Sequence, residues 1–220
     1  MEAFQRAFEL LRSGDENGLR DLLDQQPALA DARDGGSVSL LMHCIYTGRR
    51  DLAEQISARR TNLDIFEAAS LGRLDRLRQL IADPAAVGSR SPDGFTALHF
   101  ACFFGQSAAA RLLIESRAAV DAIAANPMKV MPLHSAASAR NLEAARHLLE
   151  HGAPVNARQQ AGWAPIHAAA QNGDRPMVEL LLKHRADPAL RNDAGMTPAA
   201  VARQKGHEEI ALLLEQATAA

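Results

Sequence analysis

One short stretch of the sequence carries the residue types of a hydrolytic metal centre. His147 and His151 stand four residues apart with Glu150 between them. This H-x-x-E-H spacing places two imidazoles on one face of a helix, where they can share a zinc ion. A metal-dependent hydrolase built on these three residues is therefore one hypothesis, and it requires a third ligand that the fold brings close.

Three further histidines, His99, His134 and His167, recur at nearly regular intervals. Each stands fourth in a block of six similar residues, and a fourth block follows one interval later without a histidine. The aligned blocks are Thr96–Ala101, Met131–Ala136, Ala164–Ala169 and Thr197–Ala202. Self-similarity at a nearly fixed period predicts a repeat architecture.

Each block carries the signals of a helix start. Threonine can cap a helix, and proline suits the first helical turn, where a missing N–H costs nothing. Six residues past the histidine position stands a glycine that can end the helix in a left-handed conformation, except in the second block, where that residue is Arg140. The glycines that end the first helices are Gly105, Gly173 and Gly206. A second apolar helix and a turn follow each block.

The blocks resemble the ankyrin repeat, whose T-P-L-H-x-A signature recurs about every 33 residues. The resemblance covers residues 87–216. It implies an all-α ankyrin-repeat solenoid with β-turn fingers, in which each repeated histidine is a structural bridge between turns. Successive parallel helices lie roughly 8–10 Å apart, so the three histidines cannot converge on one metal ion. The H-x-x-E-H stretch falls on the second helix of a repeat.

The glycine marker extends the pattern upstream from Gly105 through Gly72, Gly48 and Gly14. The first and last of these intervals are each close to one repeat period, whereas the interval between Gly48 and Gly72 is clearly shorter. We therefore expect about seven stacked helix pairs in one continuous solenoid. Residues 1–86 form degenerate repeats that include the N-terminal cap, residues 8–23, and residues 87–220 form four well-matched repeats that include the C-terminal cap.

The short interval leaves no room for a finger between its two helices. Thr61 is followed three residues later by Asp64. This pair is predicted to be a capping box that restarts the helix directly.

Composition excludes several classes of function. The chain of 220 residues has 24 basic and 26 acidic residues, a net charge of −2, which lacks the excess that a phosphate backbone demands. We expect no nucleic-acid partner, no membrane segment, no cofactor and no catalytic activity. Cys44 and Cys102 are expected to be reduced core residues. The chain is expected to be a cytoplasmic monomer.

The resemblance also predicts which residues face a partner. In ankyrin repeats, the finger tips and the exposed ends of the first helices line the concave, ligand-binding side. The only Trp, the only Tyr and three of the seven Phe fall on these rows, and clustered exposed aromatic residues are typical of protein-binding hot spots. The predicted binding residues are Tyr46, Leu71, Phe95, Phe103, Phe104, Val130, Trp163, Gln171, Asn172, Met196, Gln204 and Lys205.

The leading hypothesis is a non-catalytic scaffold that binds a protein partner of unknown identity. Two alternatives stay open: the metal-dependent hydrolase, and a dedicated accessory or chaperone-like subunit of a neighbouring protein. At the level of packing, Phe103 and Phe104 could instead bury one another, and Phe95 and Trp163 could stack between repeats. The finger before His134 has two extra residues and is apolar, so it can either adapt to a partner or pack on its neighbours.

Overall fold

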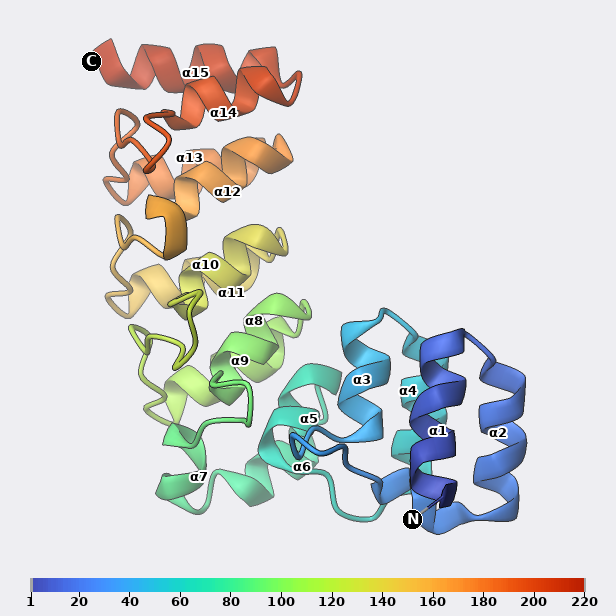
Figure 1. The fold of residues 1–220 in the computed structure, drawn as a ribbon. Coiled ribbons are helices and arrows are strands. Elements are labelled where there is room, and N and C mark those ends of the chain that lie inside the picture. Colours follow the sequence, from blue (N-terminus) through green and yellow to red (C-terminus); the bar gives the residue numbers. More distant parts are fainter. Residues whose placement is uncertain (1, 220) are drawn as a thin grey trace. The chain divides into compact units, whose positions relative to one another are not determined.

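A computed structural model describes residues 2–219, which form helices joined by loops (Figure 1). The chain divides into two compact units, the first ending at Glu67 and the second beginning at Ala68. We call them unit 1 and unit 2. None of the helices within residues 2–219 is long and apolar enough to cross a membrane.

Unit 1 consists of two helix pairs and a short 3-10 turn, and the next helix begins at its end. The elements are α1 (Glu2–Ser13), α2 (Glu16–Gln25), η1 (Pro27–Asp31), α3 (Leu40–Tyr46), α4 (Arg50–Ala58) and the start of α5 (Ile65–Leu71).

Unit 2 is a stack of helix pairs in which first helices pack on first helices and second helices on second helices (Figure 1). After α5 come α6 (Leu74–Leu80), α7 (Pro84–Gly88), α8 (Ala97–Phe103), α9 (Ser107–Glu115), α10 (Pro132–Ser138), α11 (Leu142–Glu150), η2 (Gln160–Gly162), α12 (Pro165–Asn172), α13 (Arg175–Lys183), α14 (Pro198–Gln204) and α15 (Glu208–Ala219). The first helices of the four matched repeats are α8, α10, α12 and α14.

The prolines, the threonine cap and the left-handed residues start and end the helices at the predicted positions. α10, α12 and α14 each begin with proline, and the Thr197 hydroxyl accepts a hydrogen bond from the Ala200 N–H at 3.2 Å. Gly173 ends α12 with φ +64°. Arg140 adopts φ +56° after α10, so a non-glycine residue supplies the left-handed turn there.

One expectation for the degenerate repeats was wrong in detail. Asp64, not Thr61, caps α5: its Oδ1 accepts the N–H groups of Phe66 and Glu67 at 3.0 and 2.9 Å, and Glu67 Oε2 accepts the Asp64 N–H at 2.9 Å. The capping box lies three residues later because the carboxylate reaches two N–H groups of the first turn. Pro84 begins the short α7, behind the cap residue Asp83.

The core consists of leucine, isoleucine and alanine from both helices of each pair. Leu98, Leu113, Leu133, Leu148 and Ile166 are fully buried in unit 2. Cys44 and Cys102 are buried and free. Burial raises the pKa of the Cys44 thiol to about 12 and that of Cys102 further still, so both behave as small apolar side chains.

Candidate partner-binding surface

Four fingers of unit 2 are closed by the same backbone hydrogen bond. The N–H groups of Ser91, Ala124, Gln159 and Asn192 donate to the carbonyl oxygens of Phe95, Val130, Trp163 and Met196, over 2.8, 2.8, 2.8 and 3.1 Å. The closing residues stand six positions apart in the second finger and four positions apart in the others, which confirms the two extra residues. Each bond fixes one predicted surface residue beside the start of a first helix.

Backbone hydrogen bonds also join each finger to the next. The Ala125 N–H donates to the Gly94 carbonyl at 2.9 Å, Gln160 to Met128 at 2.9 Å and Asp193 to Ala161 at 3.0 Å. At Gly94, with φ +86°, an added Cβ would lie 2.6 Å from the Ala125 carbonyl oxygen. The fingers therefore form a continuous, hydrogen-bonded surface.

The repeated histidines fix this surface from beneath. Nε2 of His99, His134 and His167 bonds the carbonyl oxygens of Val130, Ala157 and Met196 in the following finger, at 3.0, 3.0 and 3.2 Å. Each Nδ1 accepts the N–H of the residue before its own helix, at 3.2, 3.1 and 3.2 Å. The predicted structural bridge is thus confirmed.

Burial keeps these imidazoles neutral. It lowers the pKa of His99 and of His134 to about 4 and lowers that of His167. The neutral ring can donate from Nε2 and accept at Nδ1 at once, which is what each bridge requires.

Both histidine side chains of the H-x-x-E-H stretch make local contacts at the end of α11. His147 Nδ1 lies 3.6 Å from Glu150 Oε2, and His151 Nδ1 donates to the His147 carbonyl oxygen at 2.8 Å. Within residues 2–219 no three His, Cys, Asp or Glu side chains are grouped so that they could hold a metal ion. The hydrolase hypothesis therefore lacks its third ligand in the described chain.

The phenylalanines of the first matched repeat divide between packing and exposure. The Phe104 ring stacks on Phe100 at a centroid distance of 6.3 Å, and Phe95 lies 5.7 Å from both His99 and Phe100. Phe103 meets Phe104 edge-on at 5.2 Å yet remains 52% exposed. Phe95 and Phe104 are half-buried, so only Phe103 among these four phenylalanines presents most of its ring to solvent.

At the finger ends, the prediction of exposure was wrong for Val130. Its side chain is only 6% exposed. Its carbonyl accepts both the Ala124 N–H and the His99 imidazole, which holds this residue against α8 and buries it. Trp163 and Met196 are half-buried, and Trp163 packs on His167 of its own repeat at 5.6 Å.

The polar residues at the helix ends are mostly free to meet a partner. Gln171, Gln204 and Lys205 are exposed. Asn172 is half-buried, and its amide donates to the Ala137 and Ser138 carbonyl oxygens at 3.2 and 3.1 Å, so it ties α12 to α10.

The two remaining predicted residues lie at the same helical position in the degenerate repeats. Leu71, at the end of α5, is half-buried, and Tyr46, at the end of α3 in unit 1, is 41% exposed.

A pocket of about 310 Å³ lies between the second and third fingers and the helices beneath them. It contains two predicted residues, Trp163 and Gln171. Six other lining residues were not among the predicted site residues. Four of these six lie in fingers, either just before Trp163 or in the lengthened finger, and this proximity to predicted features is the sequence signal that could have found them. The lining residues are Met128, Ser138, Gln159, Gln160, Ala161, Trp163, Ala168 and Gln171.

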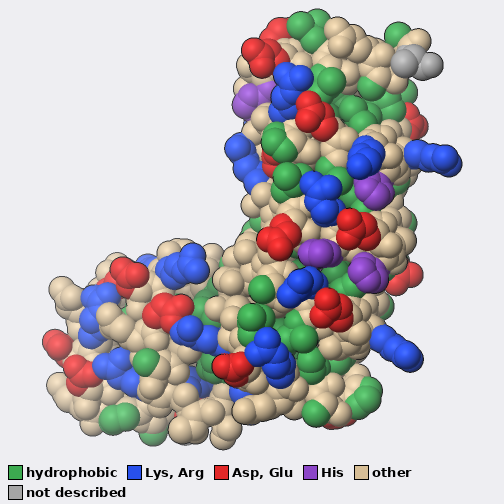
Figure 2. Space-filling model, turned by 180° about the vertical axis from the view of Figure 1, so that it is seen from behind, with side chains coloured by type: hydrophobic (Ala, Val, Ile, Leu, Met, Phe, Trp, Pro, Cys, Tyr) green, Lys and Arg blue, Asp and Glu red, His purple; other side chains and the backbone are tan. Residues whose placement is uncertain are grey.

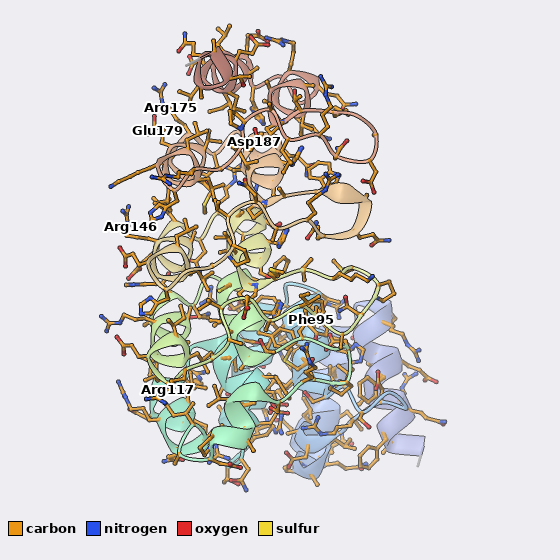
Figure 3. The ribbon with its side chains drawn as sticks, turned by 90° about the vertical axis from the view of Figure 1, so that its left-hand side faces the viewer. Phe95, Arg117, Arg146, Arg175, Glu179 and Asp187 are labelled. Atoms are coloured by element: carbon orange, nitrogen blue, oxygen red, sulfur yellow. The ribbon has the colours of Figure 1, made fainter. Side chains whose placement is uncertain are left out.

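Two faces of unit 2 differ in what they present. Figure 3 places Phe95 on the finger side, whereas Arg117, Arg146 and Arg175 extend from the side of the second helices. In the view from behind, acidic, basic and histidine side chains intermingle with small apolar patches (Figure 2). Phe103 ends the first helix α8, and the pocket is lined by two fingers and by α10 and α12. Both therefore belong to the surface formed by fingers and first helices, which we call the finger face.

Comparison with known proteins identifies the repeat. A family model described as ankyrin repeats in three copies matches residues 65–159 and 154–219. The chain is also 27% identical over 168 residues to the SMC5-SMC6 complex localization factor protein 1 of Bos taurus. That match covers 71% of this chain and 16% of the relative, so the chain spans about a sixth of that protein's length.

Ankyrin repeats are generally protein-interaction modules and are typically non-catalytic. The family match extends over more than half of the chain and coincides with the bridged, finger-bearing repeats described above. The chain therefore belongs to the ankyrin-repeat family.

Proposed function

We propose that this protein is a non-catalytic adaptor that binds another protein through the finger face of unit 2. The observation that carries the proposal is Phe103, a phenylalanine left 52% exposed on a surface whose neighbouring fingers are fixed by hydrogen bonds. Large apolar side chains on rigid elements are the usual anchors of protein interfaces. A cytoplasmic location and a monomeric state remain part of the same prediction.

Binding to such a surface would lose little conformational entropy. The histidine bridges and the finger-to-finger bonds fix the backbone before a partner arrives. Ordering loops and side chains is a main cost of association, so a preformed face favours affinity. Gln171, Gln204 and Lys205 would supply polar contacts at the rim, where hydrogen bonds give specificity more than energy.

The relative supports a role within a larger assembly. Its name describes a factor that localises a protein complex, and an ankyrin segment in such a factor would act by binding. For this chain, we propose the same kind of activity, attachment of one protein to another, without assigning the same partner.

Affinity capture from a lysate of the cells that make the protein tests the proposal. Phe103→Ser should remove the partner that the wild-type protein enriches, as identified by mass spectrometry. Leu212→Ser is the matched control, because Leu212 on α15 is 48% exposed and lies on a second helix, off the finger face. Circular dichroism should show unchanged helix content in both variants.

Two results would count against this assignment. Retention of the same partner by Phe103→Ser, together with its loss in Leu212→Ser, would move the binding site to the second helices. A single protein captured in one-to-one ratio, without exchange for other ligands, would favour the dedicated accessory subunit instead.

A further inference from the structure

We infer that the pocket between the second and third fingers holds an apolar side chain of an acidic, extended segment of the partner. This inference rests on the proposed function and names the chemistry that the finger face recognises.

Two large apolar side chains stand in the pocket wall on fixed fingers, beside the polar residues Ser138, Gln159, Gln160 and Gln171. Met128 from the second finger is 49% exposed, and Trp163 from the third is half-buried. The Gln160 N–H donates to the Met128 carbonyl at 2.9 Å, so the two fingers hold a constant spacing. A volume of about 310 Å³ is at the small end of ligand sites and suits one or two side chains. A thioether and an indole both accommodate aliphatic or aromatic groups.

One polar atom behind the pocket lining has no hydrogen-bond partner within residues 2–219. Gln159 lines the pocket, and its Oε1 is the buried side-chain oxygen for which residues 2–219 provide no hydrogen bond. A buried carbonyl without a donor is costly, and supplying a donor recovers that cost. Oε1 itself is buried, so the Gln159 amide must turn toward the pocket to meet a ligand. An extended segment offers backbone N–H groups beside its side chains, so it can then donate to Gln159 while an apolar side chain enters the pocket.

The charges around the pocket favour an acidic partner. No lining residue is charged. Within two positions of the lining residues, the sequence contains the bases Lys129, Arg140 and Arg158 and no Asp or Glu. In space, Asp193 also lies beside the rim, because its N–H donates to the Ala161 carbonyl oxygen, and its carboxylate is paired with Arg158 at 3.3 Å. The two bases that keep no acidic partner among the described contacts are Lys129 and Arg140. Lys129 and Arg140 are exposed, and the Arg140 guanidinium bonds only the neutral Asn172 carbonyl among the contacts described. Such a rim attracts carboxylates and disfavours a basic segment.

Selection from a phage-displayed library of short random peptides, with the full chain as bait, tests the inference. Enriched peptides should carry net negative charge around an apolar residue. Trp163 is the only tryptophan, so its emission reports directly on the pocket: synthetic copies of the peptides should shift it on titration, and added salt should weaken binding.

Variants test the charge of the rim and the Gln159 acceptor separately. Lys129→Glu with Arg140→Glu should weaken peptide binding about tenfold or more, whereas Arg146→Glu, a charge reversal on exposed α11, should leave it unchanged. Gln159→Met should weaken binding about tenfold, since the acceptor is lost, without lowering the melting temperature. Circular dichroism should confirm that each variant folds.

The outcomes distinguish the pocket from the wider proposal. Basic peptides, peptides that leave Trp163 emission unchanged, or no enrichment at all would overturn the pocket assignment. If partner capture from lysate still depends on Phe103, the proposed function stands without it. If capture fails as well, both are wrong.

Discussion

Arg117 follows α9 in a left-handed conformation, with φ +65°, where the equivalent residue after α11 is Gly152 at φ +84°. A side chain in this region costs about 1 kcal/mol, because Cβ crowds the backbone. Glycine removes that crowding. The turn after α9 is therefore slightly less stable than the equivalent turn after α11.

We predict that Arg117→Gly raises the free energy of unfolding by about 0.5–1 kcal/mol. Arg117 is exposed and the described contacts give its side chain no hydrogen bond or ion pair, so little else should change. Urea denaturation followed by circular dichroism measures the difference. Gly152→Ala is the converse control and should lower stability by a similar amount, and a loss of stability in Arg117→Gly would contradict the argument.

Glu67 on α5 occupies the helix position that histidine occupies in the matched repeats. It is the third residue of its helix, as His99 is of α8, and its Oε2 accepts the Asp64 N–H at 2.9 Å as His99 Nδ1 accepts that of Thr96. Its other oxygen accepts from Arg60 Nη1 at 2.5 Å. Glu67 is fully buried and the Arg60 side chain is 4% exposed. An acid-base pair therefore replaces the histidine bridge where the finger is absent.

We predict that Glu67→Ala destabilises the protein by about 3 kcal/mol, because it leaves the buried Arg60 with only the exposed Asp31 as counter-charge. The double variant Arg60→Met, Glu67→Leu should lose clearly less, since no unpaired charge remains. A double-mutant cycle in urea measures the coupling. Equal losses in the single and double variants would show that the charge pair is not what stabilises this turn.

Gly94 and Gly195 occupy the same place in two fingers but face different surroundings. Both have positive φ, +86° and +75°. An alanine Cβ at Gly94 would lie 2.6 Å from the Ala125 carbonyl oxygen, whereas nothing lies within 4 Å at Gly195. The first glycine is needed for contact with the next finger, the second only for the turn.

We therefore expect Gly195→Ala to cost about 1 kcal/mol from backbone strain alone. Gly94→Ala should cost at least about 1 kcal/mol more, because the neighbouring backbone must move. Thermal denaturation of the two variants gives the difference. Hydrogen exchange at the Ala125 amide should accelerate only in Gly94→Ala, and equal behaviour of the pair would argue against a rigid finger face.

Across the whole molecule, the histidine bridges belong to unit 2 alone. Between the unfolded pKa of about 6.5 and the folded value of about 4 for His99 and His134, the unfolded chain binds more protons than the folded one. Their stabilising contribution is complete above pH 6.5 and is lost as the pH falls toward 4.

We predict that acidification from pH 7 to pH 5 lowers the stability of unit 2 by about 2 kcal/mol for each of these two histidines. Hydrogen exchange, corrected for its intrinsic pH dependence, should show the loss in residues 97–138 before residues 2–58. Replacement of His99 by Gln should reduce the pH dependence. A uniform loss across both units would mean that other groups govern the acid response.

The repeat, its period and the seven helix pairs could be predicted from the sequence, and the resemblance to the ankyrin repeat implied the bridging role of the three histidines. The helix pairs follow from local physics, because prolines and caps start helices and left-handed glycines end them. Because the same start and end residues recur in each repeat, the same helix pair forms in each repeat. For the same reason, the position of the H-x-x-E-H stretch on the second helix of a repeat follows from the sequence alone.

What each side chain contacts across repeats depends on the tertiary structure. Val130 is buried because the His99 bridge and the finger bond meet on its carbonyl, and Asn172 is used to join α12 to α10. Glu67 substitutes for histidine through Arg60, seven residues before it. The pocket beside Trp163 arises from four segments of two repeats. Whether a side chain is buried, and whether a pocket forms beside it, depends on distances between neighbouring repeats. The sequence pattern of a single repeat does not contain these distances.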